Sequence, residues 1–238
     1  MTTQTAGCAS ASQLPAGDNH DRRLMALTAD PPVAPNYTHT DLLERARASR
    51  EKFKDYVAQK LDGFAERQAR RRERAVPVLA FLGMGRAGKD TSAEYFCLKT
   101  GLSYVGSSSS MVLPIIADSI GVPPARAWVE RHQNRQFWID WCHAFRHDDP
   151  AMLVKMSLGC GDVAVGVRGK VELHTVQQQK LIDYTVWVDN PRVENDPTVE
   201  FGVADCDFSI PNYGGVTGLY QRIDVLVRML GTHHFGAK

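Results

Sequence analysis

The chain has 238 residues, a formal net charge of +1, 43% hydrophobic residues and 23% charged residues. This composition is ordinary for a globular protein, and the length suits one domain with an extension. No apolar run reaches the roughly 18 residues that a transmembrane helix needs, so we expect no membrane partner. The five cysteines are scattered without a Cys-x-x-Cys pair, which predicts neither a zinc site nor a disulfide framework. Because the chain also lacks a signal-peptide pattern, we expect a cytoplasmic protein.

The first third of the chain divides into an arm and a helix. Residues 1–36 are rich in Thr, Ala, Ser and Pro and are predicted to be a disordered arm. Residues 37–75 carry apolar residues at helical spacing and are predicted to form one basic amphipathic helix, capped by Thr40. Asp41 to Arg74 contain 11 Lys or Arg and 7 Asp or Glu, a local charge of +4. Such a helix either packs on the core with its basic face in water or contacts a nucleic-acid backbone.

The remaining residues, 76–238, alternate between short apolar runs and helical patterns. This order predicts an α/β domain with a parallel sheet flanked by helices. We expect strands at residues 76–82, 103–105, 163–167, 184–188 and 208–210. We expect helices at residues 90–99, 111–120, 124–147, 151–156 and 217–230.

A glycine-rich segment lies between the first expected strand and the helix that follows it. It reads Gly83-Met84-Gly85-Arg86-Ala87-Gly88-Lys89 and fits the pattern G-x-x-x-x-G-K. Glycines let the backbone curl so that N–H groups point at phosphate oxygens, and the helix N-terminus favours an anion. Lys89 can then reach the β- and γ-phosphates of ATP. Asp90 holds the usual position of the magnesium-binding hydroxyl and Thr91 follows it, so both are candidate Mg²⁺ ligands. The segment from Gly83 to Thr91 therefore predicts ATP binding by a P-loop NTPase fold.

Residues 88–91, Gly-Lys-Asp-Thr, resemble the loop of the bacteriophage deoxynucleoside monophosphate kinases. Residues 104–116 and 135–153 look like further segments of that family, and residues 163–172 look like its D-V-R-x-x-x-E strand, with Arg168 and Glu172 in place. Residues 207–214, followed by Leu219, resemble an ending that is shared with dephospho-coenzyme A kinases. The resemblance covers residues 76–230 and implies phosphoryl transfer from ATP, in the host cytoplasm if a phage encodes the chain.

The sequence departs from the family pattern at three places. Gly166 replaces the aspartate before Val-Arg, and Pro114 is followed by two isoleucines where the family has leucine and lysine. Between Asp189 and Ile210, Arg192 is the only basic residue, and the acidic ones are Glu194, Asp196, Glu200, Asp205 and Asp207. A lid that closes over two phosphorylated substrates needs arginines. These departures favour an alcohol over a phosphate as the acceptor.

A related group of phage kinases, the 5-hydroxymethyluracil DNA kinases, phosphorylates such an alcohol within DNA. The basic helix is compatible with a DNA acceptor, whose target base would have to be flipped or unpaired to reach Lys89. Aromatic residues that could stack on that base are Tyr104, Trp128, Phe137, Trp138 and Trp141, although at helical spacing they also suit a core.

An alcohol acceptor benefits from a carboxylate that takes its proton, and the candidates are Asp118, Asp140 and Asp162. Asp162 is preferred because it directly precedes an expected strand. Arg168 matches the family arginine and is a candidate phosphate contact. Arg131 and Arg135 are spaced to share a helix face, where they either contact the acceptor or pair with Glu130 and Asp140.

The sequence thus favours an ATP- and Mg²⁺-dependent kinase with Lys89, Asp90, Asp162 and Arg168 as catalytic residues. The first expectation for its acceptor is the hydroxymethyl group of 5-hydroxymethyldeoxyuridine in DNA. A deoxynucleoside monophosphate kinase is the alternative, and a non-catalytic P-loop nucleotide-binding protein is the third reading. The oligomeric state is left open.

Overall fold

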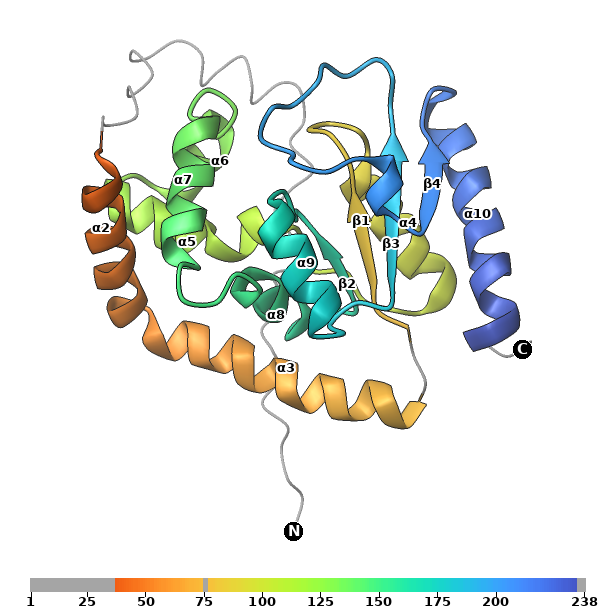
Figure 1. Cartoon of the computed structure of the whole chain (residues 1–238), viewed down its shortest axis with the longest axis horizontal. Coiled ribbons are helices and arrows are strands. Elements are labelled where there is room, and N and C mark those ends of the chain that lie inside the picture. The colour runs from red at the N-terminus through yellow and green to blue at the C-terminus, as the bar shows by residue number, and fades with distance from the viewer. Residues whose placement is uncertain (1–36, 75–76, 235–238) are drawn as a thin grey trace. The chain divides into compact units, whose positions relative to one another are not determined.

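Four parallel strands form the sheet at the centre of the computed structural model, in the order β2-β1-β3-β4 (Figure 1). The strands are β1 (Leu79–Leu82), β2 (Val163–Val165), β3 (Tyr184–Asp189) and β4 (Phe208–Pro211). The structure describes residues 37–74 and 77–234, so the expected disordered arm lies outside the described residues. The prediction of an α/β class with a parallel sheet flanked by helices is confirmed.

Strand β1 lies inside the sheet, and its four residues are completely buried. Leu79 pairs with Val163 of β2 on one side and with Tyr184 of β3 on the other. Because all strands run in the same direction, the residues that follow them meet at one edge of the sheet, which we call the carboxyl edge. The opposite edge is called the amino edge.

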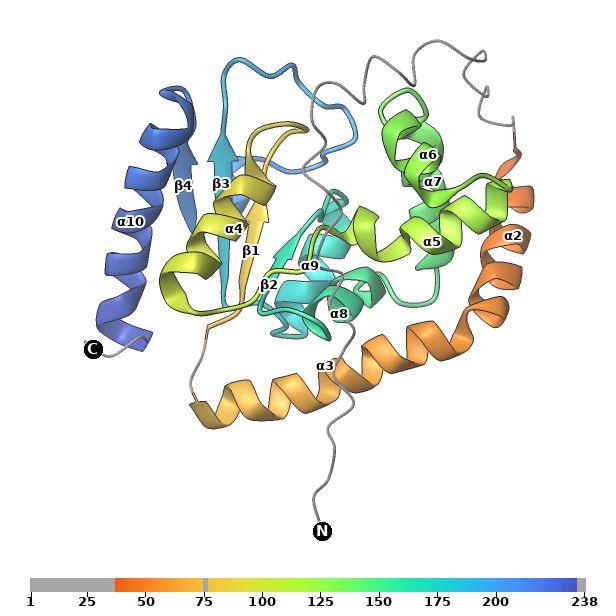
Figure 2. The ribbon, with the colours of Figure 1, turned by 180° about the vertical axis from the view of Figure 1, so that it is seen from behind.

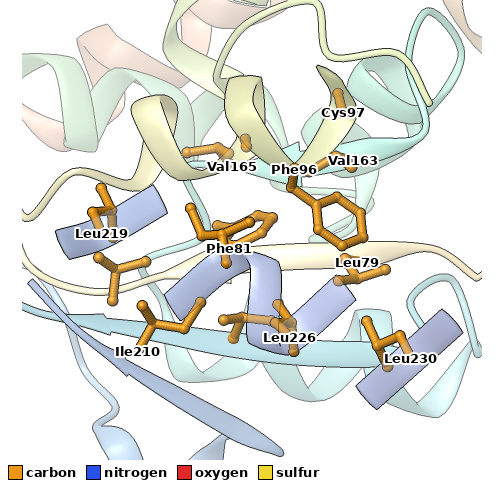
Figure 3. Close-up of a cluster of buried hydrophobic side chains, with 14 of the residues drawn as sticks. Leu79, Phe81, Phe96, Cys97, Val163, Val165, Ile210, Leu219, Leu226 and Leu230 are labelled. Atoms are coloured by element: carbon orange, nitrogen blue, oxygen red, sulfur yellow. The ribbon is translucent and has the colours of Figure 1, made fainter. Parts of the chain in front are cut away.

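Helices cover both faces of the sheet. On one face, α4 (Lys89–Thr100) and α10 (Gly215–His234) pack with Leu79 and Phe81 of β1, as Figures 2 and 3 show. On the other face, α8 (Met152–Leu158) and α9 (Lys170–Gln178) pack with Ala80 and Leu82. This alternation along β1 is what two covered faces require of a buried strand.

A second hydrophobic cluster consists of helices alone. It joins α2 (His39–Lys52), α5 (Ser108–Ile120), α6 (Pro124–Glu130) and α7 (Arg135–Phe145) around the buried Trp141 and Phe145. Helix α3 (Lys54–Arg74) runs along α8. A short 3-10 helix, η2 (Val203–Asp205), precedes β4.

The prediction of a single helix at residues 37–75 is wrong, because α2 and α3 are separate helices that meet at Phe53. Thr38, not Thr40, caps α2 through a reciprocal capping box with Asp41. A capping box satisfies two backbone donors at once, which explains why the helix begins two residues earlier. Both helices pack on the rest of the unit that includes the sheet, α2 against α7 and α3 against α8.

Three further expectations need correction. Residues 103–105 form no strand, although the Ser103 carbonyl accepts a hydrogen bond from the Asp162 N–H at 2.7 Å. The helix expected at residues 124–147 is divided by a turn at residues 131–134. Helix α9 was not anticipated from the sequence. Among the described residues, none of the helices combines the length and apolar character needed to cross a membrane.

Candidate functional site

The glycine loop, Gly83 to Thr91, connects β1 to α4 at the carboxyl edge. Gly83 has φ 136° and Gly88 has φ 101°, values that L side chains rarely adopt. A Cβ atom on Gly83 would lie 2.5 Å from the Val188 carbonyl oxygen, so the loop backbone passes directly over β3. Gly88 precedes α4 without a side-chain cap, which leaves the first N–H groups of the helix available to an outside acceptor.

Lys89 is buried within this loop and is only 7% exposed. Its Nζ donates a hydrogen bond to the Met84 carbonyl at 2.5 Å. Burial, with Arg168 and Arg135 nearby, lowers the pKa of Lys89 to about 8, against the opposing effect of Asp90 and Asp196. A buried ammonium among other cations is stabilised by an anion, so the site favours the binding of a negatively charged group.

Arg135 and Arg168 meet beside the loop at a single carboxylate, that of Asp196. Asp196 Oδ2 lies 2.6 Å from Arg168 Nη1 and also accepts a hydrogen bond from Arg135 Nη2. Burial opposes ionisation of Asp196, but hydrogen bonds from Thr198 and Arg168 and the charges of both arginines lower its pKa to about 2. The structure therefore brings together two of the predicted acceptor-binding arginines, and Asp196 connects them.

Arg131 reaches the same region from the end of α6, with its guanidinium carbon 3.6 Å from the centre of the Trp128 ring. Burial lowers the pKa of Arg131 and the nearby Asp90 carboxylate raises it. The expected shared helix face with Arg135 does not exist, because Arg131 is the first residue of the turn at 131–134 and Arg135 begins α7. The expected partners are also occupied elsewhere: Glu130 pairs with Arg126, and Asp140 accepts from Gln136.

Asp90 is exposed and accepts a hydrogen bond of 2.6 Å from the Tyr104 hydroxyl. Burial, followed by the charge of Asp90, raises the pKa of Tyr104, which keeps this hydroxyl a donor. Within the described residues, His, Cys, Asp and Glu form no group of three or more suited to a metal ion. A magnesium ion carried by a nucleotide needs only one or two protein oxygens, because phosphates and water supply the others. The assignment of Asp90 and Thr91 as ligands of such an ion stays a prediction.

The backbone of Arg168 is held by Glu172, at the start of α9. Glu172 Oε2 accepts the Arg168 N–H at 3.2 Å and forms a buried ion pair with Arg146. Gly166, at the position where the kinases that the sequence resembles have aspartate, has φ 109°. It approaches the first residues of α5 so closely that a Cβ would lie 3.1 Å from the Ser108 nitrogen. Position 166 therefore supplies a turn, and Arg146 is a supporting residue that the sequence analysis missed.

Asp162 does not belong to this site. It directly precedes Val163, which pairs with Leu79 at the start of β1, so Asp162 lies at the amino edge. It accepts hydrogen bonds from Arg67, Arg71 and Ser103. The expectation that Asp162 acts near the loop is contradicted by this position, and its carboxylate instead anchors α3. Asp118, another candidate base, forms an ion pair of 2.5 Å with Lys52 of α2.

Asn212 completes the glycine loop from the end of β4. Its Nδ2 donates to the Ala87 carbonyl at 2.7 Å, and its backbone N–H donates to Asp189. The family resemblance included this asparagine, but the residues alone did not identify its role. Asp196 was noted only as an unfavourable negative charge, because sequence spacing cannot show that two distant arginines converge on it.

Comparisons of the chain with models of protein families, with curated proteins and with solved structures found no match. The interpretation of the site therefore depends on its own residues: a curled glycine loop, a buried lysine and three arginines at the carboxyl edge.

Proposed function

We propose that this protein is an ATP-dependent phosphotransferase whose acceptor is a deoxynucleotide. The observation that carries this proposal is the concentration of cations around the glycine loop, where the buried Lys89 is influenced by both Arg168 and Arg135. Such a group of cations at the N-terminus of a helix is suited to a polyphosphate. The parallel sheet, with the glycine loop after its inner strand β1, supports a P-loop NTPase fold.

Each residue of the loop has a role in this proposal. The N–H groups from Gly83 to Gly88 and the first turn of α4 bind the phosphates of ATP, and Lys89 neutralises charge on the phosphoryl group during in-line transfer. Asp90 and Thr91 would hold the nucleotide's Mg²⁺, which supplies further charge neutralisation when bound. Arg168, and Arg135 beside Gly85, stabilise the charge of the transferred group.

The arginines favour an acceptor that brings its own phosphate. The segment from Asp189 to Ile210 has few basic residues, but Arg131 and Arg135 reach the site from the α6–α7 region instead. A monophosphate is largely ionised at neutral pH, since its second pKa is about 6, so its oxygen can attack without a general base. This suits a site in which the carboxylate between the arginines, that of Asp196, is a poor base because its pKa is about 2. A deoxynucleoside monophosphate is therefore our first acceptor.

The hydroxymethyl group of 5-hydroxymethyldeoxyuridine in DNA is the second candidate. The Trp128 ring, which stacks with Arg131 near Asp90, is the observation that favours it, because a flipped base can stack on such a surface. Helix α3 is attached to the opposite edge of the sheet from the glycine loop. Its residues Arg67 and Arg71 bind Asp162 at the amino edge, away from the glycine loop. DNA would instead approach along α6 and α7.

The test is transfer of the labelled γ-phosphate of ATP in two parallel reactions. One contains free deoxynucleoside monophosphates, including 5-hydroxymethyl-dUMP, and the other contains DNA with 5-hydroxymethyluracil beside unmodified DNA. We expect labelled diphosphate in the first reaction and none with the Lys89→Ala variant. Label in the modified DNA alone would assign the second acceptor. ATP binding without transfer to either acceptor would leave a non-catalytic nucleotide-binding protein.

A further inference from the structure

Asp196 is the one buried residue in the stretch from Asn190 to Pro197, where the neighbouring side chains are exposed or half-buried. Its side chain is 6% exposed and uses both carboxylate oxygens. Oδ2 binds Arg135 and Arg168, and Oδ1 accepts from the Thr198 hydroxyl at 2.5 Å and the Thr198 N–H at 3.2 Å. The carboxylate therefore attaches this stretch to the site, together with the Thr198 hydroxyl, which accepts from Arg168 Nη1 at 2.9 Å.

The position of this carboxylate is next to the glycine loop. The Asp196 N–H contacts the Met84 sulfur at 3.5 Å, and Arg135 lies against Gly85, the next residue of the loop. Arg135, Arg168 and Asp196 all affect the pKa of Lys89. A negative group thus already lies between the two arginines at the place where a phosphoryl group beyond the loop would bind.

We propose that Asp196 is an exchangeable internal anion: it occupies a phosphoryl position between Arg135 and Arg168, and the phosphate of a bound nucleotide replaces it. This inference rests on the proposed function and adds a determinant of specificity to it. A nucleotide gains the two arginines only if it carries a phosphoryl group that reaches them. A nucleotide without that group leaves Asp196 in place.

Charge favours the replacement of the Asp196 carboxylate by a phosphoryl group. A carboxylate offers one negative charge to two guanidinium groups, whereas a phosphoryl group offers more charge and enough oxygens to bind each guanidinium in a bidentate manner. Outside Asp196 and Thr198, the stretch is held at its start, where Arg192 donates to the Tyr213 carbonyl at 3.0 Å and Val193 packs against the core. The exchange therefore requires movement only of the residues that follow Val193. The segment that moves ends at Phe201, which stays in place because it is buried against Trp187.

The experiment compares Asp196→Asn with Glu194→Gln in the full chain. Glu194 is an exposed acid in the same stretch, so its variant removes an equal charge without touching the arginines. Calorimetric titration measures the affinity of each protein for ATP, ADP and dTMP. We expect Asp196→Asn to bind at least one of them about fivefold or more tightly, a typical coupling magnitude, and Glu194→Gln to bind as the wild type does.

The ligand that gains affinity identifies the phosphate that replaces Asp196. A gain for ATP with little gain for ADP assigns the position to the γ-phosphate, and a gain for dTMP assigns it to the acceptor phosphate. Hydrogen exchange gives a second readout: the same ligand should accelerate exchange in residues 190–198 of the wild type and have little effect there in Asp196→Asn. Thr198→Ala serves if Asp196→Asn fails to fold: it keeps the Asp196 charge but removes the hydrogen bonds of the Thr198 hydroxyl with Asp196 and Arg168, so a smaller gain is expected.

Two failures are distinguishable. If the wild type binds neither ATP nor ADP, the proposed function is wrong. If the wild type binds ATP but Asp196→Asn binds all three ligands no more tightly than Glu194→Gln, Asp196 is a structural anchor and the exchange does not occur.

Discussion

The guanidinium of Arg135 fills the space that a side chain at Gly85 would need: a Cβ atom on Gly85 would lie 2.5 Å from Arg135 Nη2. Position 85 therefore accommodates a side chain only if Arg135, which lies at the start of α7 and fifty positions along the chain, shifts its guanidinium. This contact connects the loop to the Arg135–Asp196 ion pair. A substitution at position 85 should therefore weaken anion binding more than it lowers the stability of the fold.

We predict that Gly85→Ala reduces affinity for ATP about tenfold or more while lowering the free energy of unfolding by less than about 1 kcal/mol, because a flexible side-chain end can move aside. Isothermal titration and urea unfolding measure the two quantities. The matched control is Gly83→Ala. There the obstacle is the Val188 backbone and φ is 136°, so strain of about 1–3 kcal/mol should appear as lost stability. Equal stability losses in the two variants would contradict this account.

The pKa of Lys89, lowered to about 8 by burial and then by Arg168, predicts that ATP affinity falls as the pH rises through that value. Above it, the free protein must take up a proton before it can pair with phosphate, and the uptake costs affinity. The Lys89→Arg variant stays charged, so its ATP affinity should be nearly flat between pH about 7 and about 9.5. Parallel titrations of both proteins check this, and identical pH profiles would exclude Lys89 as the titrating group.

The same pKa shift has an opposite effect on stability. The folded-state pKa of about 8 is below the unfolded value of about 10.4, so the charged lysine destabilises the nucleotide-free fold below pH 8. That penalty is relieved as the pH rises from the folded to the unfolded value. We expect Lys89→Met to be more stable than the wild type at neutral pH, with the difference shrinking toward pH about 10. Urea unfolding at several pH values measures it.

Asp162 should be important for stability and not for chemistry. Removing its charge leaves Arg71, which is 5% exposed, without its ionic partner, and the loss of one partner of a buried pair costs about 3–5 kcal/mol. We expect Asp162→Asn to lower the thermal midpoint strongly and to keep kcat at temperatures where it is folded. Asp118→Asn breaks an exposed pair with Lys52 and should cost less than about 1 kcal/mol. A folded Asp162→Asn protein without activity would restore the catalytic role.

Glu172 and Arg146 should behave as one unit. Glu172→Gln leaves Arg146 buried without a counter-charge and loosens the backbone of Arg168. The free energy of unfolding should therefore fall, and the KM for the acceptor should rise. Adding Arg146→Met removes the orphaned charge and should recover stability, whereas the KM defect remains because Arg168 is still less well positioned. A double-mutant cycle on unfolding free energy, with KM measured for each variant, separates the two effects. Full recovery of KM in the double variant would show that Glu172 does not position Arg168.

The sequence predicted the layered fold well because its strongest signals are local. Buried runs such as Leu79–Leu82 and the glycine pattern after them reflect a strand covered on both faces and a tight turn. The errors arose where neighbours override local preference. Residues 103–105 have strand-like composition but make too few backbone pairs. The cap at Thr38 was an error of another kind, because the capping box that Thr38 forms with Asp41 is itself a local pattern that was overlooked.

The site was less predictable for a different reason. Arg131, Arg135 and Arg168 were identified as candidates, yet the geometric premise for the first two was wrong, since Arg131 belongs to the turn at 131–134 and only Arg135 lies on α7. Asp162 was assigned to the site because it precedes a strand, although in a parallel sheet that position faces the amino edge. Asp196 could not be found at all, because its significance depends on partners 28 and 61 residues away.

The hydrogen bond from Asn212 to Ala87 spans 125 positions of the chain. During synthesis the glycine loop emerges first, but β2, β3 and β4, which border and support it, are made much later. A ribosome-bound chain that has not yet reached residue 212 has the loop residues without the contact that holds Ala87 in place. If the proposed function holds, full nucleotide affinity should therefore be acquired only after residue 212 has been made.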